Sequence, residues 1–236
     1  MEYTVFVVIA FFSSLVSAIF GIGTALLLLG VGAFVLPVKE TIALSTVLFL
    51  AAGLTKTSLF RTSIDWKLAA VVTLASLPTA YIGAAMVDTM PVDWLRRLLG
   101  LSIVAYLLIT TVFSHVTIKL NQFGLIAGSG VYGFVSGLLG SGNVIKALLF
   151  RELAMGKESF VGIMAATSIL TNVAKLNAYA NDGLLHERHL VVGGALVACA
   201  VVSAYIGRNI MQKIPLNRFR HGVSLVLFCA ALNLLW

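Results

Sequence analysis

The sequence predicts an all-α polytopic membrane protein made of two tandem homologous repeats, and three observations lead to this fold class. The chain of 236 residues is 60% hydrophobic and 11% charged, whereas soluble domains carry about 25% charged residues. Apolar runs of roughly 18 or more residues recur between short polar loops, as in transmembrane helices. Finally, two similar stretches lie 119 residues apart. We expect the first transmembrane repeat at 1–113, a linker at 114–122 and the second repeat at 123–236.

The two similar stretches each interrupt an apolar run with a pair of glycines. Residues 17–24 read SAIFGIGT, and residues 136–143 read SGLLGSGN. The offset of 119 relates Ser17 to Ser136, Gly21 to Gly140, Gly23 to Gly142 and Thr24 to Asn143. Because Thr and Asn are favoured helix N-caps, each break is expected to end one helix and start another. Paired broken helices in a duplicated membrane protein are typical of secondary transporters, which hold their substrate near the breaks.

The remaining elements follow the same repeat. Apolar segments are expected at 3–20, 23–36, 41–60, 67–87 and 94–113, and again at 123–139, 143–150, 158–180, 189–207 and 219–236. Lys56 corresponds to Lys175 at the offset of 119, and Pro91 to Pro215 at 124. An offset that is constant over a long stretch and then changes once, here from 119 to 124, indicates tandem duplication followed by an insertion. Two of the segments, 23–36 and 143–150, are too short for a hydrocarbon core of about 30 Å and are interpreted as half-helices.

The number of spans stays open. Eight spans result if each broken pair makes one net crossing, which gives about four spans plus a broken or re-entrant half-helix in each of two parallel repeats. Ten spans result if each half-helix crosses fully, which gives inverted repeats. Counting basic residues by the positive-inside rule gives the same ratio for both arrangements and does not separate them. We favour about four spans per repeat. The segment after Glu2 has no basic start and is expected to be a retained span rather than a signal peptide.

The charges inside the apolar segments indicate an anionic substrate. All nine acidic residues fall in loops or at span ends, whereas Lys56, Lys146 and Lys175 lie within or near the spans. A charge at the bilayer centre costs roughly 2.5–3.5 kcal/mol, so it tends to persist where it meets a counter-charge. Lys146 lies in the first turn of a half-helix, where unpaired N–H groups and the helix dipole already favour an anion. The alternative for each lysine is that it snorkels to the headgroups.

The predicted substrate site combines these lysines with the breaks. Glycine allows the backbone to approach a ligand, and the N–H groups that follow can form an anion-binding concavity. Polar side chains beside Lys175 could add neutral donors, or could instead bond neighbouring helices. The predicted substrate-binding residues are Gly21, Gly23, Thr24, Lys56, Gly140, Ser141, Gly142, Asn143, Lys146, Asn172 and Lys175.

No catalytic residue, metal site or cofactor is expected, and the chain is not expected to be an enzyme. Cys199 and Cys229 lie inside apolar runs without ligand neighbours. His186 and His189 are interpreted as loop residues, and no Walker motif is present. The net charge of +7 resides mostly in loops, where it sets topology rather than binding nucleic acid. The expected partners are a small anionic substrate and the lipid bilayer, and homo-oligomerisation is left open.

Residues 43–104 carry a family resemblance. They combine an alcohol-rich span, the Asp65-Trp66 entry into the next helix, an Ala/Gly-rich span, Pro91 and a basic pair, and 165–235 repeats much of this pattern. The pattern resembles the sulfite exporter TauE/SafE family. That resemblance implies export of sulfite or an organosulfonate such as sulfoacetate across the bacterial inner membrane. The family usually has a glycine cluster and a proline after each break. Because this chain lacks them, Lys146 is interpreted as a substitute for the lost backbone donors.

The leading hypothesis is therefore a secondary transporter that moves a small sulfur-containing anion by alternating access around two broken helices. The alternatives are an anion channel, a transporter of a different oxyanion or carboxylate, and a subunit of a membrane complex without transport activity of its own.

Overall fold

The computed structural model describes residues 2–21, 24–95, 97–98, 101, 121–151 and 155–215, and the regular elements in these ranges are all helices. They are α1 (Glu2–Phe20), α2 (Thr24–Gly32), α3 (Val38–Leu59), η1 (Arg61–Ser63), α4 (Trp66–Thr89), α6 (Gln122–Leu139), α7 (Asn143–Arg151), α8 (Lys157–Ala166), α9 (Ile169–Asn181), η2 (Glu187–His189) and α10 (Leu190–Lys213). Within them, six helical segments are long and apolar enough to cross a membrane, α8 and α9 together forming one. This confirms an all-helical polytopic protein. The predicted segment 219–236 and most of 94–113 lie outside the described residues.

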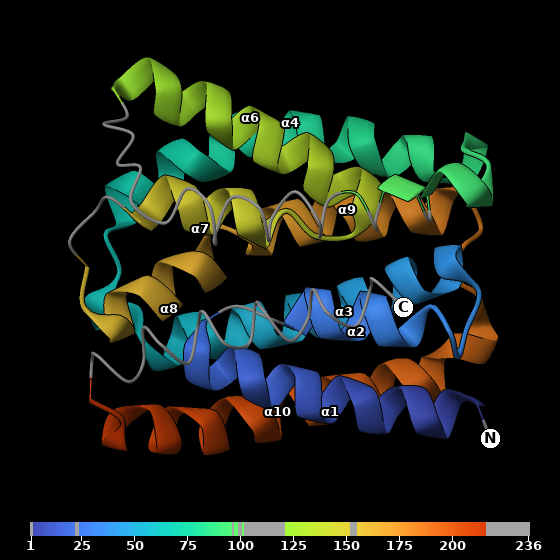
Figure 1. The fold of residues 1–236 in the computed structure, drawn as a ribbon, viewed down its shortest axis with the longest axis horizontal. Coiled ribbons are helices and arrows are strands. Elements are labelled where there is room, and N and C mark those ends of the chain that lie inside the picture. Colours follow the sequence, from blue (N-terminus) through green and yellow to red (C-terminus); the bar gives the residue numbers. More distant parts are fainter. Residues whose placement is uncertain are drawn as a thin grey trace.

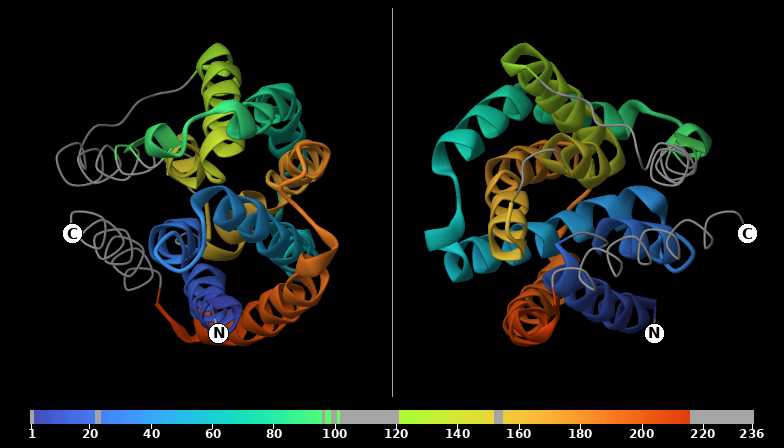
Figure 2. Two further views of the ribbon diagram at one scale, coloured as in Figure 1. Left: turned by 90° about the vertical axis from the view of Figure 1, so that its right-hand side faces the viewer. Right: turned by 60° about the vertical axis from the view of Figure 1, so that its left-hand side comes forward.

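The long helices lie side by side along the long axis of the molecule (Figure 1). The pair α4 and α6 forms one side and the pair α1 and α10 the other, with α3, α9 and the short helices between them (Figure 2). Phe6, Leu44 and Leu196 belong to a core cluster that joins α1, α3 and α10. The short helices thus lie in the interior, between the two outer pairs of helices (Figure 1 and Figure 2).

Contacts between helices define their relative directions. Tyr3 of α1 bonds to Glu40 near the start of α3, and Ser17 contacts Lys56 near the end of α3, so these helices run parallel. Lys39 at the start of α3 contacts Asp88 at the end of α4. Between α4 and α6, Ser76 lies against Gly133 and Ala80 lies against Gly137, so residue numbers rise together along these two helices. Hence α4 is antiparallel to α3 and parallel to α6, and α1 and α6 run in opposite directions. The described helices follow the inverted alternative rather than parallel halves, while the repeat itself stays a prediction.

Both predicted interruptions are present. Helix α1 ends at Phe20 and α6 ends at Leu139, and the next residues, Gly21 and Gly140, have φ of 81° and 78°. This left-handed conformation is strained for any residue with a Cβ, so glycine ends each helix there. Helices α2 and α7 begin at Thr24 and Asn143 themselves, one position later than an N-cap.

A third interruption was not predicted. The segment 158–180 was expected to be continuous, but α8 ends at Ala166 and α9 begins at Ile169. The hydroxyl of Thr167 donates to the carbonyl of Ile163 at 2.7 Å, and that of Ser168 donates to the carbonyl of Met164 at 2.9 Å. Such bonds from Ser and Thr to the preceding turn compete with the regular helix ladder and bend helices.

Glycines allow α4 and α6 to pack with their backbones in near contact. A Cβ at Gly137 would collide with the backbone of Ala80, and one at Gly133 would collide with the backbone of Ser76. Small residues at such crossings are the usual means of close helix association in membranes. This packing holds the end of α6, and thus its break, in a defined position.

Candidate functional site

A cavity lies where the three interruptions meet, and the empty space in and in front of it, open solvent included, is about 480 Å³. It receives side chains from α1, α3, α6 and the α8–α9 segment, together with the turns after α1 and α6. Its lining residues are Ser17, Gly21, Thr24, Phe49, Ala52, Gly53, Lys56, Tyr132, Ser136, Gly140, Ser141, Asn143, Met164, Ala165, Ser168, Asn172 and Lys175.

Most residues of the predicted site line this cavity. They are Gly21, Thr24, Lys56, Gly140, Ser141, Asn143, Asn172 and Lys175. Gly23 lies outside the described residues. Gly142 and Lys146 are close by but are not part of the lining. A Cβ at Gly142 would lie 2.6 Å from the carbonyl oxygen of Tyr132, so this glycine lets the turn pack on α6.

Lys56 and Lys175 bring two ammonium groups to the cavity. Both are buried, with 8% and 1% exposure. Lys56 Nζ donates to Ser17 Oγ at 3.1 Å, and Lys175 Nζ donates to Ser136 Oγ at 3.3 Å and to the Gly140 carbonyl at 2.9 Å. An ammonium has three N–H donors. Among the described residues, two donors of Lys56 and one of Lys175 therefore have no protein acceptor, and they are available to a ligand.

Lys146 has a different environment. It is fully buried, and its Nζ donates to the Met164 carbonyl at 2.6 Å, to Tyr132 Oη at 3.3 Å and to Ser168 Oγ. These bonds use all three of its donors and connect α7 to α6 and to the break between α8 and α9. Lys146 thus lies behind the cavity wall and contributes its charge from there. None of the three lysines snorkels to the outer surface.

The sequence did not single out three of the residues that hold Lys146. Tyr132 lies in an apolar, glycine-rich run, and Ser168 and Met164 were expected inside a regular helix. Their role depends on the α8–α9 interruption, which exposes a carbonyl to the ammonium. The adjacent Thr167-Ser168 pair was the one local signal for that interruption.

The electrostatics of the cavity favour an anion. The ammonium groups of Lys56 and Lys175 line it, that of Lys146 lies behind its wall, and none of the described lining residues is acidic. Burying a charge without a counter-charge costs several kcal/mol, so the empty site is electrostatically unfavourable. The remaining polar groups, including the hydroxyls of Ser17, Ser136 and Ser141, are neutral. A small anion would offset the buried positive charge and accept hydrogen bonds from several sides.

Comparisons with known proteins agree with this chemistry. A search of curated proteins and a search of solved structures found no match. The family model described as Sulfite exporter TauE/SafE matches residues 6–234, which is nearly the whole chain. The proteins of that family are transporters of sulfur-containing anions. With six membrane-capable helices and this match, the chain belongs to the sulfite exporter TauE/SafE family of multi-pass membrane transporters.

Proposed function

We propose that the protein is a secondary transporter that exports a small sulfur-containing anion, sulfite or an organosulfonate, across the bacterial inner membrane. The observation that carries this proposal is a cavity lined by two buried ammonium groups, with a third behind its wall, and no acidic residue in its described lining. Family membership supports the substrate class.

The contacts of the cavity suggest how an anion binds. Its oxygens accept hydrogen bonds from the free donors of Lys56 and Lys175, and the nearby hydroxyls and amides supply neutral donors. Charge-assisted hydrogen bonds of this kind are worth about 1.5–3 kcal/mol each. A zwitterion such as taurine would find no described acidic partner for its ammonium group in the lining, so it should bind more weakly than sulfoacetate.

Two matched contacts support alternating access. In Ser17–Lys56 and in Ser136–Lys175, a serine from a helix that ends at a break bonds to the lysine that follows this serine by 39 residues in the chain. The helices involved, α1 and α6, run in opposite directions, as expected for transporter halves that open alternately to the two sides. In this mechanism the anion stays between the two lysines while one bundle moves against the other.

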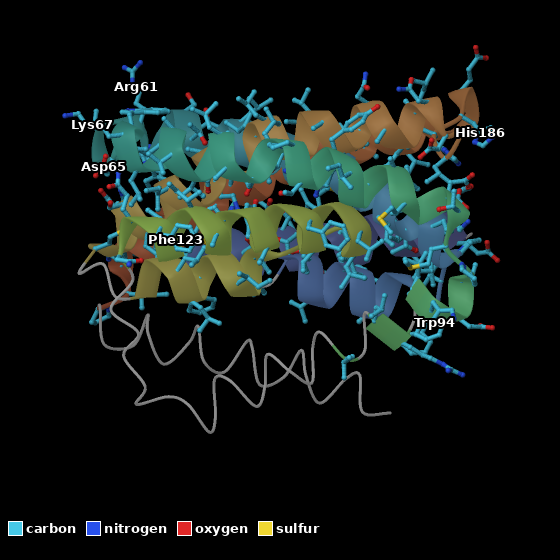
Figure 3. The ribbon with its side chains drawn as sticks, turned by 90° about the horizontal axis from the view of Figure 1, so that it is seen from above. Arg61, Asp65, Lys67, Trp94, Phe123 and His186 are labelled. Carbon is cyan, nitrogen blue, oxygen red and sulfur yellow. The ribbon has the colours of Figure 1, made fainter. Side chains whose placement is uncertain are left out.

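Basic residues favour one orientation in the membrane. Arg61 and Lys67 lie at one end of the molecule (Figure 3), and Lys157 and Lys213 join them there because α8 begins beside η1 and the end of α10. Lys39 lies at the opposite end with Asp88. By the positive-inside rule the first end is cytoplasmic. Impermeant thiol reagents should therefore label Lys39→Cys but not Arg61→Cys in intact cells, in a background without native cysteines.

A ligand screen tests the substrate class. The purified protein is heated with sulfite, sulfate, thiosulfate, sulfoacetate, taurine or simple carboxylates, because a bound ligand stabilises the folded state by mass action. Stabilisation by sulfite or sulfoacetate, followed by saturable uptake of that anion into proteoliposomes, supports the proposal. Stabilisation by carboxylates alone would contradict the sulfur-anion assignment. Single-channel currents far above carrier turnover would favour the channel instead.

A further inference from the structure

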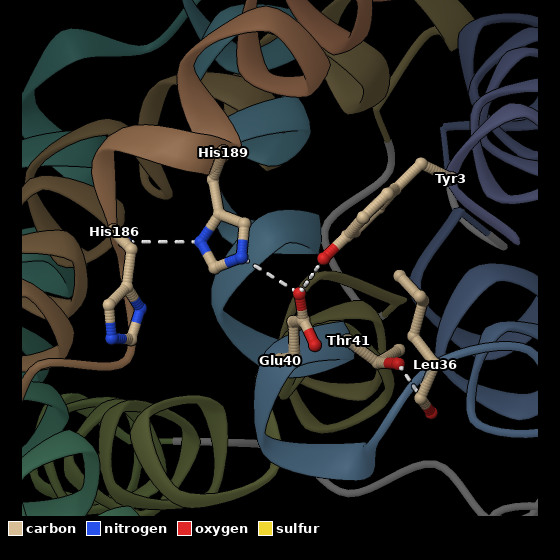
Figure 4. Close-up of polar contacts among 6 residues, drawn as sticks. All are labelled: Tyr3, Leu36, Glu40, Thr41, His186 and His189. Atoms are coloured by element: carbon tan, nitrogen blue, oxygen red, sulfur yellow. Dashed lines mark hydrogen bonds and ion pairs between the residues drawn. The ribbon is translucent and has the colours of Figure 1, made fainter.

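A second polar cluster lies far from the cavity, at the end of the molecule where the chain begins. Tyr3 Oη donates to Glu40 Oε1 at 2.6 Å, and His189 Nε2 lies 2.8 Å from the same oxygen (Figure 4). The side chains of His189 and Glu40 are only 4% and 13% exposed. His189 was expected to be a loop residue, and Glu40 an ordinary residue at a span end. The structure instead makes them a buried pair that joins α1, α3 and the start of α10.

The hydrogen bonds define where the protons lie. The backbone N–H of His186 donates to His189 Nδ1 at 3.1 Å, and this nitrogen can accept only when it carries no proton. The imidazole is therefore neutral in this arrangement, and Nε2–H donates to Glu40. An additional proton goes either to Nδ1, which breaks the bond from His186, or to the free oxygen of Glu40, Oε2. The first event changes how η2 holds the His189 ring. The second neutralises the carboxylate that Tyr3 and His189 share and weakens it as an acceptor.

Among the described side chains, the charged residues near the pair in sequence, and the one paired with its neighbour, make no ion pair or hydrogen bond with it. Lys39, next to Glu40 on α3, turns to Asp88 of α4 at 3.5 Å. Glu2 on α1 and Glu187 on η2 are exposed. Tyr3 and the ring of His186 are the other titratable groups in contact, the two histidine rings lying 5.5 Å apart edge to face. The described charged neighbours are thus paired elsewhere or face outward.

The same helices carry both the cluster and the anion cavity. Helix α1 contacts α3 through Tyr3 and Glu40 at one end and through Ser17 and Lys56 near the other. The two contacts are 14 residues apart on α1, or about 21 Å at 1.5 Å per residue. Ser14 of α1 also meets Ser203 of α10 at 2.6 Å. A change in how α1, α3 and α10 are held together at one end therefore reaches the cavity wall as a movement of whole helices.

We propose that Glu40 and His189 form a proton-binding site that controls anion transport through the positions of α1, α3 and α10. In the deprotonated state the cluster holds the three helices together and keeps this end closed. Uptake of one proton by the pair either breaks the bond from His186 or neutralises the carboxylate that joins the helices, and this allows the end to open. This rests on the proposed transport function, and it adds a proton as the second ligand, at a site separate from the anion cavity.

The transport test uses proteoliposomes and sulfoacetate, whose charge is constant between about pH 5 and 8, the range in which histidine titrates. With equal pH on both sides, wild-type flux should rise several-fold as the pH falls. Glu40→Gln and His189→Gln should lose this dependence. Glu187→Gln removes an exposed carboxylate of the same short helix as His189, so this control should retain the wild-type profile. A wild-type profile in His189→Gln, or pH-independent wild-type flux, would overturn the proposal.

A second measurement does not depend on flux. In protein labelled with ¹⁵N-histidine, the signal missing from His189→Gln identifies the ring, which should show the Nε2–H form at high pH. Its titration should shift in Glu40→Gln and stay unchanged in Glu187→Gln. An identical titration in Glu40→Gln would exclude the pair as one proton site. If no anion is transported at any pH, the transport function fails, and this titration still decides whether the proton site exists.

Discussion

Replacing Lys56 by methionine tests whether the cavity lysines serve binding rather than stability. Among the described residues, Lys56 has one protein acceptor, Ser17 Oγ at 3.1 Å, which leaves two of its donors for a ligand in the cavity that it lines. Loss of one charge-assisted bond to an anion removes about 1.5–3 kcal/mol. At 1.4 kcal/mol per factor of ten, Lys56→Met should weaken anion binding about 10- to 100-fold.

The effect on stability should have the opposite sign. The substitution removes one hydrogen bond worth about 1 kcal/mol, but it also removes a buried cation without a described counter-charge. Replacing buried charges by apolar residues of similar size is often neutral or stabilising by about 1–4 kcal/mol. The unfolding temperature of the ligand-free variant should therefore equal or exceed that of the wild type, even though binding is weaker.

Lys157→Met is the matched control. Lys157 Nζ donates to the carbonyls of Met211 and Ile214 at 3.0 Å and to that of Gln212 at 3.2 Å, so it caps the end of α10 far from the cavity. Its loss should lower the unfolding temperature and leave anion affinity unchanged. Both variants are measured by thermal unfolding with and without titrated sulfite or sulfoacetate. Normal affinity in Lys56→Met, or a large loss of stability without anion, would refute the reasoning.

Three further predictions concern the supports of the cavity. Lys146→Met leaves the groups around it without their shared donor, so it should lower the unfolding temperature and slow uptake. It should reduce anion affinity less than Lys56→Met does. An affinity loss as large as that of Lys56→Met would instead indicate direct contact between Lys146 and the anion. Gly140→Ala places a Cβ on a residue in the left-handed conformation, with φ of 78°. It should lower the free energy of unfolding by about 1–3 kcal/mol, as measured by denaturant unfolding. Wild-type stability of this variant would contradict the observed break. Gly137→Ala should separate α4 from α6 and destabilise the protein, while Gly156→Ala, which meets nothing within 4 Å, should not; equal unfolding temperatures of these two variants would argue against the close packing.

Much of the fold class and of the cavity could be predicted from residue pattern alone. Long apolar runs with few charges are stable only in a bilayer, so composition was sufficient to indicate a polytopic helical protein. The glycine pairs marked both interruptions because the left-handed conformation after a helix strongly favours glycine. Lys56 and Lys175 could be selected because a cation in an apolar run needs a partner.

Contacts between distant segments could not be read in this way. The sequence predicted that Lys146 binds the substrate because it lies in the first turn of a half-helix, but the number of acceptors around an ammonium depends on which helices fold beside it. Three protein acceptors use every donor of Lys146, whereas Lys56 has one. The acceptors come from a break between α8 and α9 that has no glycine pair to mark it.

The amino-acid sequence by itself determined that the chain is embedded in a membrane, where the two glycine-marked breaks lie and which cations belong to apolar segments, because these properties depend on local composition and backbone conformation. Only the tertiary structure decided that α1 and α6 run in opposite directions, that the free ammonium donors belong to Lys56 and Lys175, and that Glu40 meets His189. Those facts depend on helix packing between residues up to 149 positions apart, from Glu40 to His189, and local propensity carries no information about such distances.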